Sequence, residues 1–466
     1  MKIFQLLILF VVCCLKLFGQ QNTLSDKQLL ELVRLYHPVV KQTQLDIDMA
    51  NADITKARGA FNPIISNEVG KKTFEGKNYY DYFSPEISLP TWYGISMNAG
   101  VENLAGTRTD PTETLGATNF VGVSVPLAKN LLIDKRRAFL QQAKVMRDME
   151  ITQRRAALND LYMEAMEAYW SWVQAYKALQ VVNKLIEINE TRLSLINQSL
   201  KFGERAAIDT TEALTQLQNF QYLQNEYGLQ FQQAGILMSA FLWKANDEPY
   251  LLPETIVPSE ASDKIVNEIW PIPVIEELIE RATEQHPNLT IYTNKLDWLK
   301  VDKRLKFQEL LPKLDVQYNA LGKGYQMQST LTNASMFENN FKYGLKFEMP
   351  LLLGQGRGEY RKATLKIAQT VLEKKQKQVA IQLKVRNYYQ AYLTIQKQLN
   401  LLKNQLENYR RLFKAEEQKF DNGESSLFLV NSRENKLLET EVKLAEVTAK
   451  YYKTIYALQW SAGLLE

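Results

Sequence analysis

Residues able to bind a metal or act as a nucleophile are few in this 466-residue sequence. Its two histidines, His37 and His286, each precede a proline and are candidates for a pair of metal ligands. A transition-metal site usually draws on three or four histidine, cysteine or carboxylate ligands, and the two cysteines, Cys13 and Cys14, both lie in an apolar N-terminal segment. We therefore expect no metal site and no cofactor. The histidines fit ordinary packing between the end of a helix and the turn that follows it.

Signatures of enzymes and of nucleic-acid-binding proteins are missing as well. The sequence contains no glycine-rich phosphate loop, no nucleophile elbow and no HExxH motif. Its carboxylates are numerous but fall on the polar faces of expected helices, where solvation is their ordinary role. The formal net charge of +4 becomes +2 if Lys2 and Lys16 are removed with the N-terminal segment, which is too small to favour nucleic acid.

The N-terminal segment has the pattern of a secretory signal peptide, which we place at residues 1–20. Lys2 is followed by an apolar run over residues 3–18 and then by polar residues. A membrane anchor is the alternative, but the run is shorter than the roughly 20 residues that a spanning helix needs. Lipid modification of Cys13 is disfavoured because Val11 and Val12 precede it, where small residues are usual. The exported chain would then contain no cysteine and no disulfide.

The rest of the sequence repeats one pattern twice, about 250 residues apart. In each copy a second proline, Pro63 or Pro312, lies 26 residues after the histidine, and a third, Pro126 or Pro350, precedes a very long helix-forming segment. Each copy therefore predicts a helix, a strand region and a long helical hairpin. The boundaries are a first repeat at 21–250 (strands about 63–126, turn near 203), a proline-containing linker at 251–273, and a second repeat at 274–466 (strands about 312–350, turn near 423).

The helix-forming segments are unusually long. Residues 134–200 contain neither proline nor glycine, and residues 360–420 have the same character. Apolar residues recur at three-, four- and seven-residue steps, which is typical of a packed helical seam. A helix of about 65 residues would be roughly 100 Å long and could not be covered by one compact core. Gly203 and Asn422-Gly423 interrupt the pattern and predict tight turns between the two helices of each hairpin.

Alternating segments before these helices predict strands with one polar and one apolar face. Residues 341–349 are apolar at every odd position, and 313–320 alternate with the opposite parity. We expect two main strands in each repeat. The first repeat is longer in this region, and its surplus, which includes Tyr79, Tyr80, Tyr82, Trp92 and Tyr93, could form an extra hairpin. These aromatic residues fit either an interfacial belt or ordinary packing.

Four strands per chain cannot close a barrel that hides its edges from lipid. Closure then requires several chains, and three copies would supply twelve strands. Val316, Tyr318, Tyr343 and Phe347 would face lipid. The opposite face would line a wet lumen with the side chains of Lys313, Asp315, Gln317, Asn319, Lys342, Lys346 and Glu348.

The duplicated helix–strand–helix order, the proline before the first strand of each repeat and the glycine-marked turns at Gly203 and Gly423 resemble the TolC-like outer-membrane efflux proteins. The resemblance covers nearly all of the chain after residue 20. It implies a mainly α fold with a β-barrel portion: a homotrimeric, twelve-stranded outer-membrane barrel, continued by a long periplasmic α-helical barrel. It also implies two partners, a periplasmic adaptor and an inner-membrane transporter, in efflux or in type I protein secretion.

The resemblance further implies a gate and an adaptor-docking region at the periplasmic hairpin ends. Family members typically carry a glycine, a polar or basic residue two positions on, and acidic residues six and nine positions on. The first repeat matches with Gly203, Arg205, Asp209 and Glu212. Asp209 could equally be a helix N-cap with Glu212 completing a capping box. For Arg205, a solvated turn residue is the more ordinary interpretation.

The second repeat departs from the same pattern. After Gly423 it has Ser425, Leu429 and Ser432 in place of the polar or basic residue and the two acidic residues. The usual acidic ring is therefore in doubt here. Two nearby residues could supply acidity at that end instead, namely Asp421 and Glu424.

Two other classes of protein remain as alternatives to an outer-membrane channel. A periplasmic coiled-coil adaptor or scaffold would need one long hairpin and compact β-domains, whereas this sequence has two hairpins and barrel-type alternation. A passive porin would lack the long helices. The sequence does not reveal the cargo, and the placement of the helices in the periplasm depends on the family resemblance.

Overall fold

The computed structural model describes residues 23–107, 114–259, 272–332 and 339–465. The expected signal peptide, with Cys13 and Cys14, lies outside these residues. The chain divides into two compact units. The first takes in the described parts of Met1–Thr43, Arg154–Pro287 and Gln378–Glu466, and the second consists of Gln44–Gln153 and Asn288–Lys377. Each sequence repeat contributes segments to both units.

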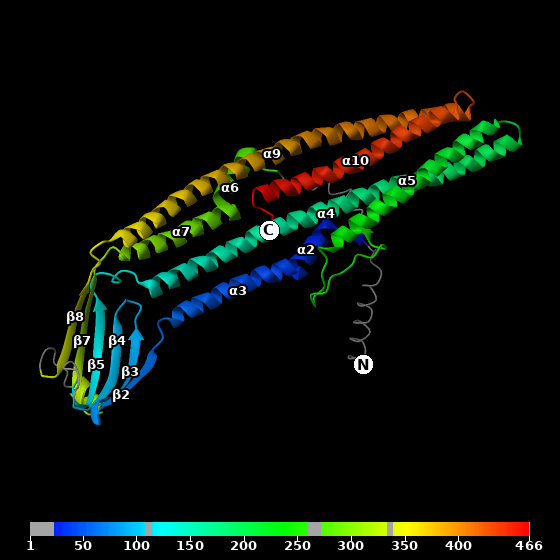
Figure 1. The fold of residues 1–466 in the computed structure, drawn as a ribbon. Helices are drawn as coiled ribbons and strands as arrows, with labels where there is room; N and C mark the ends of the chain where they lie inside the picture. Colours follow the sequence, from blue (N-terminus) through cyan, green and yellow to red (C-terminus); the bar gives the residue numbers. More distant parts are fainter. Residues whose placement is uncertain (1–22, 108–113, 260–271, 333–338, 466) are drawn as a thin grey trace, which may run out of the picture. The chain divides into compact units, whose positions relative to one another are not determined.

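The second unit contains one antiparallel sheet of six strands in the order β2-β3-β4-β5-β7-β8 (Figure 1). The expected extra hairpin is present as its first two strands. The expectation of four main strands per chain is therefore wrong, because this hairpin continues the same hydrogen-bonded ladder. The bounds are β2 Ile64–Phe74, β3 Lys77–Pro90, β4 Ser96–Ala105, β5 Gly116–Pro126, β7 Lys313–Lys323 and β8 Phe341–Glu348.

The register of the sheet confirms the expected polar and apolar faces. Residues paired across antiparallel strands point to the same face. One face of β7 and β8 therefore carries the polar pairs Lys313–Glu348, Asp315–Lys346, Gln317–Gly344 and Asn319–Lys342, and the other carries Leu314–Phe347, Val316–Leu345, Tyr318–Tyr343 and Ala320–Phe341.

The apolar face continues through the whole sheet and is open in the single chain. One ladder row joins Ile65, Ile87, Ala99 and Val121, in β2 to β5, to Ala320 of β7. On the two edge strands, Ile65 is 78% exposed and Phe347 is 65% exposed. An exposed apolar surface of this extent marks an interaction with lipid or with another protein.

The helices follow the duplicated order that the sequence predicts. The first repeat has α2 (Asp26–Tyr36), α3 (Pro38–Gly59), α4 (Lys135–Lys201) and α5 (Ala207–Ser239), and the second has α6 (Ile275–Gln285), α7 (Pro287–Gln308), α9 (Gly354–Asp421) and α10 (Leu427–Ser461). A short α8 (Met327–Thr332) lies between β7 and β8. With 67 and 68 residues, α4 and α9 are each about 100 Å long. Within the described residues, no helix is both long and apolar enough to cross a bilayer.

The core of the first unit is aromatic and draws on both repeats. Trp170 of α4 stacks on Tyr452 of α10 with ring centroids 4.1 Å apart. The hydroxyl of Tyr456 donates a 2.9 Å hydrogen bond to the buried carboxylate of Asp26 in α2. A short parallel pair of β1 (Thr23–Leu24) and β6 (Val257–Pro258) also belongs to this unit. Of the apolar seam predicted in the last helix, Leu444 is half-buried, and the other five residues are buried, namely Leu437, Val447, Tyr451, Ile455 and Leu458.

Both histidines lie at helix ends, as the packing interpretation expects. His37 caps the C-terminus of α2, and its Nδ1 accepts a 3.3 Å hydrogen bond from the backbone N–H of Val39. His286 caps the C-terminus of α6 and is 5% exposed. Burial lowers the pKa of His37. Among the described residues, His37 and His286 do not join any cluster that could hold a metal ion.

Candidate functional site at the helical hairpin ends

The two hairpin turns form as the glycines predict. Gly203, between α4 and α5, has φ +77°, and Gly423, between α9 and α10, has φ +78°. Each turn is closed by two backbone hydrogen bonds, Gly203 N–H to Leu200 and Glu204 N–H to Ser199 in the first, and the equivalent pair at Gly423 and Glu424 in the second. This is the Schellman arrangement, in which a left-handed residue satisfies the last carbonyls of the helix.

Near these turns the two hairpins pack on each other. Ile196 of α4, Ala213 of α5, Phe413 and Phe420 of α9 and Val430 of α10 form one buried cluster. The second hairpin therefore shares its core with the first. The turns and their side chains belong to one packed end within the first unit.

Arg205 joins the turn of the first hairpin to the end of the second. Its Nη2 donates a 2.9 Å hydrogen bond to the carbonyl of Phe420, and its guanidinium lies 4.0 Å from the centre of the Phe420 ring. A cation over an aromatic face is worth about 0.5–2 kcal/mol. Arg205 is thus half-buried and bound, rather than the solvated turn residue that was the alternative.

The N-cap role considered for Asp209 is wrong. Helix α5 begins at Ala207, its N-cap is Ala206, and no side chain caps it. Asp209 is the third helical residue, so its charge lies in the first turn, where it favours the positive end of the helix dipole. Glu212 consequently does not complete a capping box. Its Oε1 instead accepts a 3.2 Å hydrogen bond from Asn431 of α10.

A second amide contact continues this bridge between the hairpins. Gln216 of α5 donates a 2.9 Å hydrogen bond to Asn435 of α10. The spacing between Glu212 and Gln216 matches that between Asn431 and Asn435, so the two contacts lie one helical turn apart on each helix.

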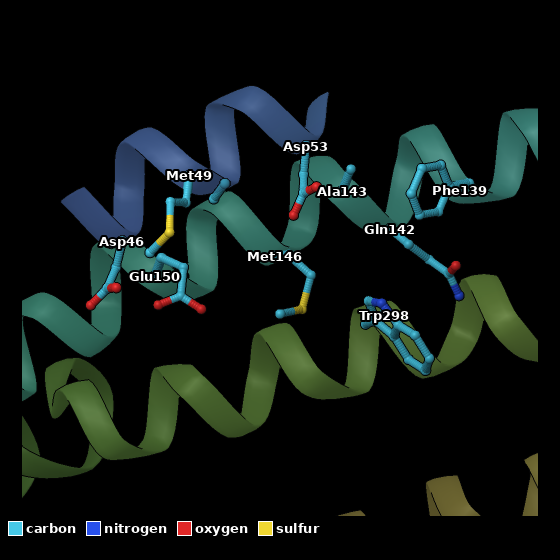
Figure 2. A pocket seen from close by; sticks show the side chains of 10 residues that line it. Asp46, Met49, Asp53, Phe139, Gln142, Ala143, Met146, Glu150 and Trp298 are labelled. Atoms are coloured by element: carbon cyan, nitrogen blue, oxygen red, sulfur yellow. The ribbon is translucent and has the colours of Figure 1, made fainter. Parts of the chain in front are cut away.

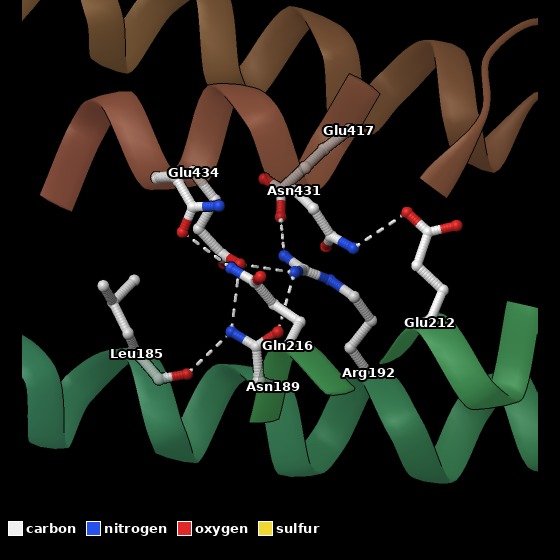
Figure 3. A network of polar contacts seen from close by, with 9 residues as sticks. Leu185, Asn189, Arg192, Glu212, Gln216, Glu417, Asn431 and Glu434 are labelled. Carbon is white, nitrogen blue, oxygen red and sulfur yellow. Dashed lines mark hydrogen bonds and ion pairs between the residues drawn. The ribbon is translucent and has the colours of Figure 1, made fainter. Parts of the chain in front are cut away.

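A buried ionic network lies beside these contacts, and sequence patterns did not predict it. Figure 3 shows Arg192 of α4 reaching two carboxylates of the second hairpin, with Nη1 2.9 Å from Glu434 and Nη2 3.1 Å from Glu417. Glu434 is fully buried and also accepts a 3.1 Å hydrogen bond from Asn189. The side chain of Arg192 is 11% exposed. A heptad pattern marks apolar seams, and it does not say which charged residue of one hairpin meets which residue of the other.

The surroundings of Glu417 in this network raise the pKa of its carboxyl group. Burial raises its pKa above the usual value near 4.5, and Glu434 and Asp421 act in the same direction. Arg192, by its charge and its hydrogen bond, opposes them and only partly offsets the burial. The side chain of Glu417 remains 37% exposed, so protons can reach it.

A groove of about 800 Å³ runs along this packed end. It is lined by Arg192, Arg205, Glu204 and Asp421 together with apolar residues of both hairpins. Asp421 and Glu424 are exposed, so the second hairpin has acidic side chains at its end. Of the seven residues predicted for the tip, Arg205, Asp421 and Gly423 line this groove and Glu212 contacts α10. The role of all seven in docking or gating stays a prediction.

In the second unit, the aromatic residues of the surplus region divide between the two ends of the sheet. Tyr79 and Tyr82 lie near the start of β3, beside the turn to β2, whereas Trp92 and Tyr93 lie in the turn that follows β3. Trp92 stacks on Phe61 just after α3, with ring centroids 4.2 Å apart. The aromatic residues at the two ends of the sheet therefore cannot form a single interfacial belt. An interfacial belt at each end is the arrangement that their positions allow.

The second unit also has an acidic pocket that the sequence did not reveal. Figure 2 shows Asp46 and Asp53 of α3 and Glu150 of α4 around a cavity of about 290 Å³, with Met49 and Trp298 in its wall. Burial raises the pKa of Glu150, and the charge of Asp46 raises it further.

The second repeat matches a known family by sequence. Residues 278–464 fit the model of the outer membrane efflux protein family. The resemblance inferred from the sequence is therefore confirmed over this part of the chain. The sequence matches no curated protein.

Solved structures share the fold over almost the whole chain. The outer-membrane channel OprN is 16% identical, with a TM-score of 0.63 over 94% of this chain and 89% of its own. The CmeC outer membrane channel of Campylobacter jejuni is 13% identical, with a TM-score of 0.65 over 94% and 86%. The MtrE outer membrane channel of Neisseria gonorrhoeae, solved in its open state, is 12% identical, with a TM-score of 0.65 over 95% and 89%. At these identities the likeness establishes the fold.

Proposed function

We propose that this chain forms the outer-membrane duct of a tripartite efflux system and acts as a homotrimer. One observation carries the proposal: a single chain joins an antiparallel sheet with an exposed apolar face to two helices of 67 and 68 residues. A sheet of this kind suits lipid on one side and water on the other. Helices about 100 Å long suit a conduit that continues beyond the membrane.

The edges of the sheet support assembly from several chains. β2 and β8 each have a neighbour on only one side, and a membrane offers no water to satisfy their free backbone groups. Several chains must therefore close the sheet into a barrel. The polar face, with Lys313, Asp315, Lys342, Lys346 and Glu348, would line its lumen.

The tip residues would contact the rest of the pump. Exposed turns with positive-φ glycines at Gly203 and Gly423 offer two similar loops to a periplasmic adaptor, which in turn holds an inner-membrane transporter. The Arg205 contact with Phe420 and the Arg192 network link the two hairpins. Movement of one hairpin away from the other must break these contacts, so we assign them to the closed state of the periplasmic opening.

Deletion of the gene tests the function directly. Cells lacking it should accumulate a fluorescent efflux substrate, and the wild-type gene should restore its export. A matched assay of protein secretion separates efflux from type I secretion, the second use of such a duct. Unchanged export in both assays would contradict the proposal.

Extraction from membranes separates the two alternative classes. The protein should stay in the outer-membrane fraction after carbonate washing, whereas an adaptor or scaffold would be released. A passive porin would restore entry of small solutes to a porin-deficient strain without any inner-membrane transporter. This chain should not do so while its periplasmic end is closed.

A further inference from the structure

The strand count of the sheet has a consequence for the assembled duct. All six strands lie in one continuous ladder, and every neighbouring pair is antiparallel. The twelve-strand expectation assumed that only β4, β5, β7 and β8 enter the wall. However, β4 is already paired on both sides, with β3 and with β5. The free edge on that side of the sheet is β2.

We propose that three copies of the chain close one eighteen-stranded barrel, in which β2 of each copy pairs with β8 of the next. The inference rests on the proposed trimeric outer-membrane function and specifies how its wall is built. At equal strand tilt, eighteen strands make a barrel about half again as wide as twelve. The lumen within the membrane would therefore be wider than the lumen of a twelve-stranded barrel.

Strand direction permits this closure. Because neighbours alternate in direction, the first and last of six strands run oppositely, so β8 meets β2 of the next copy as another antiparallel pair. The two edges also suit each other in length, with 11 residues in β2 and 8 in β8. Strands of about 9–11 residues span the outer membrane.

The register of the closing pair can be derived from the stagger of the sheet. The ladder row that starts at Ile65 in β2 ends at Phe341 in β8. If both edges begin at the same level beside the helices, Ile65 instead lies opposite Phe347 of the next copy. That shift of six residues per chain gives a tilt of about 35° for eighteen strands, within the range of membrane barrels.

The side chains of the two edges are complementary in this register. Ile65 and Val69 of β2 would extend the exposed apolar face beside Phe347 and Tyr343 of β8. On the polar face, Ser66 would lie opposite Lys346, and Glu68 would lie diagonally between Lys342 and Lys346. Opposite charges at such cross-strand positions stabilise the pair by roughly 0.2–1 kcal/mol.

The edges also lack proline, the residue that most directly blocks strand pairing. The residues of both β2 and β8 are almost all exposed in the single chain. A long, exposed edge with apolar residues is a template for pairing with another chain. A second copy of this chain supplies the partner strand.

Cysteine pairs distinguish the two ways of closing the wall. With Cys13 and Cys14 replaced by serine, the Ser66→Cys/Lys346→Cys variant places one cysteine on each proposed edge. The matched control is Asn98→Cys/Lys346→Cys, because Asn98 of β4 would lie opposite Lys346 if the wall closed through β4 with twelve strands. Both pairs lie on the polar face, and opposed residues in antiparallel strands are close enough for a disulfide.

Oxidation, or a short bis-maleimide, should convert the Ser66/Lys346 variant into a covalent trimer and leave the Asn98/Lys346 variant uncrosslinked. Amide hydrogen exchange of the wild-type trimer gives a second measurement, in which residues 64–74 and 341–348 should both be protected. Crosslinking through Asn98, or a native trimer without protected β2 amides, would overturn the inference and leave the trimeric duct standing. A monomer in detergent would instead refute the proposed trimer, and this inference with it.

Discussion

The guanidinium of Arg192 lies 2.9 Å from the carboxylate of Glu434, which has no exposed surface. The two residues belong to different sequence repeats and are 242 positions apart. This ion pair, with Asn189 and Glu417 around it, ties one helical hairpin to the other at their ends. A buried charge left without its partner is far more costly than a lost surface ion pair.

Replacing Arg192 by methionine should loosen the contact between the hairpins. Glu434 would remain buried without a cation, which costs about 3–5 kcal/mol. We expect the free energy of local opening, measured by amide exchange in residues 185–200 and 427–440, to fall by a similar amount. The control is Arg411→Met, because the Arg411–Glu407 pair is exposed and is worth about 0.5 kcal/mol or less.

The double variant Arg192→Leu/Glu434→Leu tests whether the unpaired buried charge is what destabilises the contact between the hairpins. With both charges removed, the free energy of local opening should return close to the wild-type value. The reason is that Glu434 no longer leaves a fully buried charge without its partner. Equal destabilisation in the single and double variants would mean that packing volume, rather than charge, holds the hairpins together.

Opening of the hairpin ends should depend on pH through Glu417. Its pKa in the folded state is raised, chiefly by burial, so the folded state holds the proton more tightly than the unfolded state. This contribution to stability is fully present below the ordinary value near 4.5 and is lost as pH rises through the raised folded value. After correction for the intrinsic, base-catalysed exchange rate, the protection of amides near the turns should therefore fall over that window.

The variant Glu417→Gln should remove this pH dependence, whereas Glu407→Gln, on the exposed face of the same helix, should retain it. Arg192, Glu434 and Asp421 face the same group and are unchanged in both variants. An identical pH profile in wild type and Glu417→Gln would assign the effect to another residue.

Alanine at the turn glycines should destabilise the turns. Gly203 and Gly423 have φ near +77°, a conformation that costs an L-residue roughly 1–2 kcal/mol. A methyl group added at either position would meet no atom within 4 Å, so the cost is conformational rather than steric. Faster amide exchange in the turns of Gly203→Ala and Gly423→Ala would measure the expected loss of turn stability.

Gly228 is the matched control for this prediction. It lies inside α5, a methyl group there would also meet nothing within 4 Å, and it lacks the positive φ. Gly228→Ala should stabilise the helix by about 1 kcal/mol, because glycine is a poor helix former. Equal effects at Gly203 and Gly228 would show that the turn geometry is not what selects glycine.

Gly122 should be intolerant of substitution for a different reason. A methyl group there would lie 1.8 Å from Oδ1 of Asn319 and 2.7 Å from the backbone oxygen of Tyr318. We expect Gly122→Ala to cost about 1–3 kcal/mol through the forced shift of the strand. Gly344→Ala, on the same face of β8, would meet nothing and should fold normally. The fraction of protein that migrates as folded species on unheated gels compares the two.

Sequence patterns predicted the elements of this fold well because periodicity is a local property. The parity of residues 313–320 and 341–348 assigned both faces correctly, and Gly203 and Gly423 marked both turns. The strand count was wrong because β2 alternates weakly: its sequence IISNEVGKKTF places polar residues on both faces. Only the hydrogen bonds to β3 identify it as part of the sheet.

The tip was harder to predict, because its contacts join residues that are far apart in the sequence. Arg205 and Asp209 were chosen by their distance from Gly203, yet the partner of Arg205 is the backbone of Phe420, 215 positions away. The cap expected at Asp209 failed because the helix begins two residues earlier, at Ala207. The Arg192 network depends on how two hairpins align, which no spacing within one hairpin specifies.

The antiparallel order of the sheet also means that insertions in the long helices and insertions in the strand connections have different consequences. Helices α3, α4, α7 and α9 all join the sheet at one end, whereas the connections that follow β2, β4 and β7 leave the sheet at the opposite end. An insertion in a long helix rotates every later side chain by about 100° per residue and misaligns the seams. An insertion in those connections leaves each helix in phase. The chain can therefore acquire new surface epitopes or binding loops there without altering the dimensions of its duct.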